Sequence, residues 1–147
     1  ERVLHDYLFS VEIWGHYELL FFSSCSPLLS VQLLTKYTRE MLRKPDFLQG
    51  VGKNRNMMHT LLLNGFMACI EVDDFTNALY FKKQIEKNFF EENETYFRIV
   101  YLWAEGLFDS KQGRVEEGQR KMEDAIRIFE MIGCRKSADY YRSAMEC

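Results

Sequence analysis

The feature that most constrains the fold is a short turn that occurs twice, each time between two long stretches of helical character. The two copies are Asp73-Asp74-Phe75-Thr76-Asn77-Ala78 and Gly113-Arg114-Val115-Glu116-Glu117-Gly118. Each contains a turn, a polar residue, an apolar residue, two more polar residues and then a small one. Helices joined by short turns become antiparallel neighbours. The sequence therefore predicts repeated pairs of antiparallel helices.

The rest of the chain also favours helices. No segment shows the sustained period-two alternation typical of half-buried strands. Two prolines and eight glycines in 147 residues also argue against a turn-rich all-β fold. We therefore predict one all-α domain, residues 1–147, of about eight helices. The expected helices cover residues 3–10, 14–25, 28–44, 54–72 (capped by Asn54 or Asn56), 75–90, 95–112, 115–132 and 135–145.

The repeated turn is typical of tetratricopeptide pairs, in which small residues lie where two helices cross. Gly106 lies twelve residues before Gly118, so we expect close helix contact there. The two units are 40 residues apart (Asp73 to Gly113), whereas the standard repeat has about 34 residues. We therefore predict a degenerate tetratricopeptide-like superhelix. The first helix of each pair should line its concave surface.

Composition excludes several classes of function. The net charge of -3 and the pI of about 5.7 give no basic footprint for nucleic acid. The uncharged stretch from Leu19 to Thr35 is interrupted by serines and Pro27, so no membrane span is predicted. Four widely spaced cysteines and no visible signal peptide favour the reducing cytoplasm.

Motifs that carry catalysis or bind cofactors are not found. The sequence has no Cys-x-x-Cys, His-Glu-x-x-His or Gly-x-Ser-x-Gly, and Gly50-Val51-Gly52 lacks the third glycine of a dinucleotide loop. The three histidines are far apart in the chain. We therefore expect no metal, no cofactor and no enzymatic activity.

One polar residue in an apolar helix suggests a binding surface instead. Asn64 interrupts the run from Thr60 to Glu71. Burying its amide unpaired would cost roughly 1–3 kcal/mol. Its partner must be a neighbouring helix, a water or the backbone of a ligand.

The repeat register predicts which side chains share the concave surface with Asn64. Such a mainly apolar surface with a few amides suits an extended peptide. The alternative is that the larger apolar members simply form inter-helix core. The predicted members are Thr60, Leu63, Asn64 and Met67 from one helix, Val100, Trp103 and Leu107 from a later one, and His16 from an earlier one.

Blocks along nearly the whole chain resemble the Rgg family of transcriptional regulators. The most specific block is Trp14-Gly15-x-Tyr17-Glu18-Leu19. The others are Tyr7-Leu8-Phe9-Ser10-Val11-Glu12, Leu62-Leu63-Asn64, Cys69-Ile70-Glu71, Asn77-Ala78-Leu79-Tyr80-Phe81, Ala125-Ile126-x-Ile128-Phe129 and Ile132-Gly133.

This resemblance implies a function that composition could not. Rgg proteins are cytosolic, homodimeric receptors of Gram-positive bacteria, notably streptococci, and act in quorum sensing, often on virulence genes. Their tetratricopeptide-like domain binds a short, mostly hydrophobic signalling peptide. Because this sequence lacks their helix-turn-helix, DNA binding would come only from a domain outside it. The family's peptide-contacting asparagines and arginines carry over to Asn64, and more weakly to Asn54 and Arg55.

Two functions therefore stay open from the sequence. The chain is either a peptide-sensing and dimerisation domain or a tetratricopeptide-like scaffold that binds a folded protein and no peptide signal. A helix-turn-helix upstream of Glu1 would favour the first.

Overall fold

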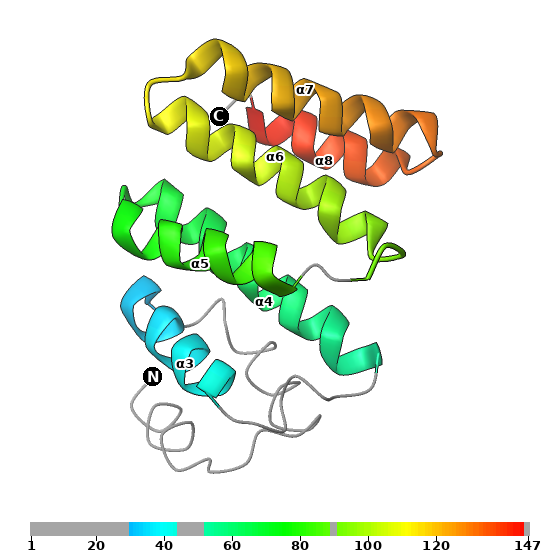
Figure 1. The fold of residues 1–147 in the computed structure, drawn as a ribbon. Coiled ribbons are helices and arrows are strands. Elements are labelled where there is room, and N and C mark those ends of the chain that lie inside the picture. Colours follow the sequence, from blue (N-terminus) through cyan, green and yellow to red (C-terminus); the bar gives the residue numbers. More distant parts are fainter. Residues whose placement is uncertain (1–29, 44–51, 89–90, 146–147) are drawn as a thin grey trace.

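The computed structural model describes residues 30–43, 52–88 and 91–145, and all regular secondary structure in these ranges is α-helical (Figure 1). The all-α prediction is confirmed. The helices predicted at 3–10 and 14–25 lie outside the described residues, so six helices are seen where about eight were expected. They are α3 (Val31–Arg43), α4 (Gly52–Glu71), α5 (Phe75–Asn88), α6 (Thr95–Lys111), α7 (Val115–Met131) and α8 (Arg135–Met145).

The predicted boundaries agree with the structure at the turns and differ at the starts of α3 and α4, since Ser30 lies before α3 although a helix was predicted from residue 28. Helix α4 begins at Gly52, so Asn54 and Asn56 lie inside it and the prediction that one of them caps it is wrong. Glycine does not exclude a helix here, because its backbone adopts helical angles at a cost of only roughly 0.5–1 kcal/mol relative to alanine.

The same turn ends α4, α6 and α7. Its first residue has a left-handed backbone: φ is 59° at Asp73, 93° at Gly113 and 81° at Gly133. The next amide then reaches back to a carbonyl in the last turn, which satisfies a group that the helix end leaves unpaired. These bonds run from Asp74 to Cys69 (2.9 Å), from Arg114 to Asp109 (2.9 Å) and from Cys134 to Phe129 (2.8 Å).

A small buried residue follows each turn at the same offset: Ala78, Gly118 and Ala138. The α7 position is the tightest. A Cβ on Gly118 would lie 2.3 Å from the carbonyl oxygen of Gly106, and a Cβ on Gly106 would lie 2.5 Å from that of Gly118. The predicted close contact of α6 with α7 is therefore confirmed, and it is a contact of backbone with backbone.

The helices stack in layers, with α3 below the pair α4–α5 and with α6, α7 and α8 above (Figure 1). Helix α4 is central because it contacts α3, α5 and α6. Aromatic rings fill the space between layers: the Phe66 ring lies 5.7 Å from Phe108 and 6.1 Å from Tyr101. None of the helices in the described ranges is long and apolar enough to cross a membrane.

Charged side chains link α5, α6 and α7 along one side of the stack. Lys82 lies 3.1 Å from Glu105, which lies 3.0 Å from Lys121, and Lys121 also reaches Asp109 at 2.7 Å. Burial alone would raise the pKa of Asp109, but Lys121 and Arg114 outweigh this effect and lower it. These contacts hold neighbouring helices in register.

We expect Gly118→Ala to lower the free energy of unfolding by about 1–2 kcal/mol. Alanine favours a helix over glycine by about 1 kcal/mol, but overpacking costs about 1–3 kcal/mol, and a clash with fixed backbone atoms falls in the upper part of that range, about 2–3 kcal/mol. The carbonyl of Gly106 belongs to the backbone and cannot rotate away. Urea denaturation measures the change. The adjacent exposed Gln119→Ala should have almost no effect, and equal stability of the two variants would contradict the close packing.

Candidate functional site

Helix α4 is buried on most of its circumference and open on one side. Leu61, Leu62 and Phe66 are fully buried among the neighbouring helices. The exposed side chains and two of the half-buried ones recur every three or four residues and therefore share one face. We call this the open face of α4; its exposed or half-buried members are Asn56, Thr60, Asn64, Met67 and Glu71.

Asn64 is exposed at the centre of this face, and among the described residues its side-chain amide has no hydrogen-bonding partner. Of the three partners expected from sequence, a neighbouring helix is therefore not used within the described ranges. Its neighbour Thr60 donates a hydrogen bond to the backbone carbonyl of Asn56 at 2.9 Å. The amide of Asn64 is left to solvent or to a ligand.

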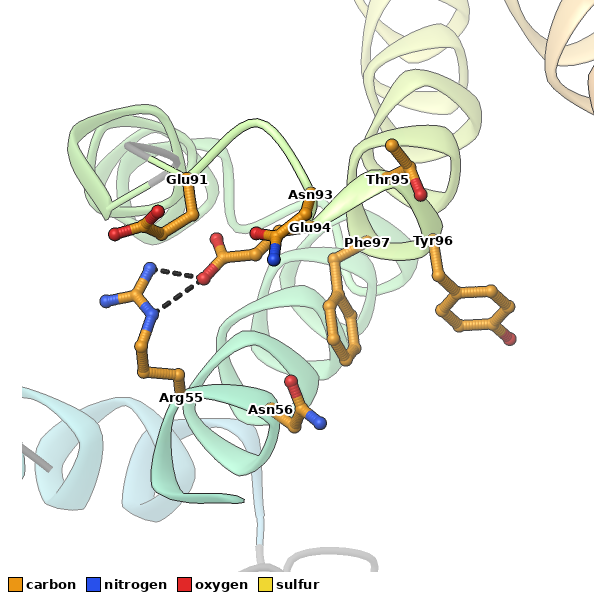
Figure 2. A pocket seen from close by; sticks show the side chains of 8 residues that line it. All are labelled: Arg55, Asn56, Glu91, Asn93, Glu94, Thr95, Tyr96 and Phe97. Atoms are coloured by element: carbon orange, nitrogen blue, oxygen red, sulfur yellow. Dashed lines mark hydrogen bonds and ion pairs between the residues drawn. The ribbon is translucent and has the colours of Figure 1, made fainter. Parts of the chain in front are cut away.

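A pocket of about 440 Å³ lies beside the open face, where the first half of α4 meets the start of α6. Figure 2 shows Asn56 on one side and the rings of Tyr96 and Phe97 across from it. Asn56 thus belongs both to the pocket and to the open face of α4. The lining residues are Arg55, Asn56, Glu91, Asn93, Glu94, Thr95, Tyr96 and Phe97.

A polar cluster closes one wall of the pocket. Arg55 Nε donates to Glu94 Oε1 at 2.6 Å, and His59 Nε2 lies 2.7 Å from Glu94 Oε2 (Figure 2 draws the Arg55 contact). Arg55 also donates to the backbone carbonyl of Asn88 at 3.2 Å. The sequence suggested Arg55 but gave no signal for Glu94, which reads only as part of a polar break between helices.

His59 is completely buried, and this burial determines its charge state. Burial lowers the pKa of His59, and the attraction of Glu94 offsets only part of this effect. The imidazole is therefore neutral at pH 7. Because a carboxylate can only accept, its Nε2–H is the donor to Glu94. The ring also lies 5.2 Å from that of Phe97, which ties it to α6.

Comparison with known proteins identifies the domain. The family model for "HTH-type transcriptional regulator Rgg, C-terminal domain" matches residues 1–143. The chain belongs to the Rgg family. This is a family of transcriptional regulators rather than enzymes.

Solved structures agree with this assignment. The SHP pheromone receptor Rgg2 of Streptococcus dysgalactiae and a cysteine-to-serine variant of it are each 28% identical, with a TM-score of 0.89. The match covers 99% of this chain and 54% or 53% of theirs. A Listeria monocytogenes EGD-e protein at 21% identity and a TM-score of 0.86, matched over 99% of this chain and 50% of its own, supports the fold alone. The chain thus spans about half the length of these relatives.

In this Rgg domain the predicted site residues fall into three groups. Thr60, Asn64 and Met67 share the open face of α4, and Leu107 is half-buried on α6. Arg55 lies in the polar cluster. Leu63, Val100 and Trp103 are only 3–4% exposed and pack between helices.

The other two predicted residues cannot be placed as side chains. Asn54 lies in the first turn of α4, and its side chain falls outside the described part. His16 falls outside it altogether.

Trp103 packs with its ring centroid 5.0 Å from that of Tyr141, and its buried Nε1 has no acceptor among the described residues. The described ranges contain no cluster of side chains that could hold a metal ion.

The buried neutral His59 should make the Rgg domain less stable in acid. Because the folded pKa is lowered, the unfolded chain binds more protons once the pH falls below about 6.5, and the free energy of unfolding then decreases. Urea denaturation between pH 7.5 and pH 5.5 measures the slope. His59→Gln, which keeps a donor for Glu94, should have a shallower slope; equal slopes would contradict this assignment.

Proposed function

We propose that this chain is the ligand-sensing domain of a cytoplasmic quorum-sensing regulator and binds a short, mostly hydrophobic signalling peptide. The observation that carries the proposal is the open face of α4. It leaves the amide of Asn64 available in the middle of a helix that is buried on its other sides. The proposed function includes homodimerisation, and DNA contact through a helix-turn-helix domain outside this sequence.

The chemistry of the open face fits a peptide. An asparagine side chain both donates and accepts, which matches the amide and carbonyl groups of a peptide backbone. Met67 lies next to it and is half-buried, and a flexible thioether adapts to differing apolar side chains. Backbone contacts at Asn64 would supply affinity for an extended chain, while apolar neighbours would select hydrophobic residues.

The S. dysgalactiae relative supports the proposal because it is itself named as a pheromone receptor. At 28% identity the likeness extends to the overall shape of the domain, while most side chains differ. The ligand of this chain is therefore expected to be a peptide of related character, with contacts of its own.

We expect Asn64→Ala to weaken peptide binding by roughly 2- to 13-fold, because one net hydrogen bond contributes about 0.5–1.5 kcal/mol. The melting temperature should stay within about 2 °C of the wild type, since the side chain is exposed. Binding is measured by fluorescence polarisation with labelled octapeptides rich in Ile and Val, and with synthetic SHP pheromone.

Gln119→Ala is the matched control, because it removes an exposed amide from the outer helix α7 and should leave affinity unchanged. The peptides are tested up to about 100 μM, which is well above the Kd expected for a receptor. If the wild-type protein binds none of them at that concentration, the peptide-sensing function is wrong. Copurification of a stoichiometric folded protein would then favour the scaffold function.

A further inference from the structure

We infer that Glu94 is a positioning residue: it holds the pair α4–α5 against α6–α7 in the arrangement that receives the ligand. The inference rests on the proposed function for its binding effect and on geometry for the contact itself. Glu94 lies between the two pairs, in the connection that leads from α5 into α6. Glu94 lies in the pocket wall, but both of its carboxylate oxygens are used by Arg55 and His59, so it acts through the helices it joins.

The side chain of Glu94 does not cap helix α6, although its position in the chain would allow it to. Glu94 is the N-cap residue of α6, where a side chain usually accepts hydrogen bonds from the first free amides of the helix. Here it makes no capping hydrogen bond. Its carboxylate reaches α4 instead, so the start of α6 is tied to the preceding pair.

Both oxygens of this carboxylate are used, one by Arg55 and the other by His59. These partners lie four residues apart, and therefore on the same side of α4. Arg55 also binds the carbonyl of Asn88 at the end of α5. One cluster thus joins α4, α5 and the start of α6.

The cluster is shielded from water, with the side chain of Glu94 10% exposed and that of Arg55 15% exposed. Removing one charge of a shielded pair leaves the other without compensation, so such contacts are costly to break. This contact is therefore stiffer than the exposed ion pairs elsewhere on the domain, such as Lys111 with Asp73.

The position of the cluster links it to the proposed binding surface. Arg55 and His59 lie directly beside Asn56 and Thr60 of the open face in sequence, and Tyr96 and Phe97 follow Glu94 closely on α6. Figure 2 shows Asn56 and these two rings facing the same pocket. The distance across that pocket therefore depends on the contacts of Glu94.

The expected consequence is preorganisation. If the pairs move freely, only a fraction of molecules has the arrangement that binds, and the apparent affinity falls by that fraction. Glu94→Gln keeps the shape but removes the charge. We expect it to weaken peptide binding by roughly 5-fold or more, the lower end of typical coupling between sites, mainly through a slower association rate.

The test compares Glu94→Gln with Glu92→Gln, which makes the same charge change at an exposed position of the same connection. Peptide affinity and rates are measured with the tightest binder of the peptide series. Hydrogen exchange is measured without peptide. We expect faster exchange in Glu94→Gln only in the first half of α4, the end of α5 and the start of α6, and no change in Glu92→Gln.

Each outcome decides something. Unchanged exchange in Glu94→Gln, or a uniform increase with a large drop in melting temperature, overturns the positioning role. Local loosening without loss of affinity also overturns it. If the wild-type protein binds no peptide, the proposed function fails, while the exchange pattern still shows whether Glu94 holds the pairs together.

Discussion

The described fold depends on one backbone device, a helix end in which a single left-handed residue reverses the chain. The following amide closes the open helix end, and a small residue then lets the next helix approach. The tightest example is the contact of Gly106 with Gly118, where backbone meets backbone. Because the same device ends α4, α6 and α7, each of these helices becomes an antiparallel neighbour of the helix that follows it.

Layering explains why an asparagine is tolerated in the middle of α4. A helix with α3, α5 and α6 against it is covered on three sides and needs apolar residues there. The fourth side has no neighbour among the described helices. Asn64 lies on that side, so the desolvation cost that its sequence context implied does not arise. A polar residue at this point is thus a consequence of the stacking order.

Much of the fold could be predicted from sequence because its determinants are local. The turns at Asp73 and Gly113 were predicted from a few adjacent residues. The matching turn at Gly133 was not predicted as a third copy, because its residues do not fit the pattern. Cys134 stands where the other copies have a polar residue, and Arg135 stands where they have an apolar one. Helix type and most boundaries followed from periodicity, which a three-layer stack preserves.

The candidate site was harder to predict because it depends on which side of a helix is left open. Polar and apolar residues do not separate cleanly onto two faces of α4, so its sequence has little amphipathic signal to distinguish Leu63 from Asn64 or Met67. On α4 the repeat register selected Thr60, Asn64 and Met67, which lie on the open face, but also Leu63, which is buried. On α6 it selected Val100 and Trp103, which are buried as well. Glu94 pairs with residues 35 and 39 positions away, and no local pattern reports such a contact.

Among the described residues, ion pairs join the helices on one side of the domain, which we call the stiff side, but not across the open face of α4. On the stiff side, Lys82, Glu105 and Lys121 join α5, α6 and α7. At one end of the stack, Glu94 joins α4 to α6. No comparable ion pair among the described residues crosses the open face of α4. Under the proposed function, a ligand on the open face would meet α4 and α6 at a spacing that the cluster around Glu94 already holds. Affinity for the ligand would then depend on this cluster, which also joins α4 to the next helix pair.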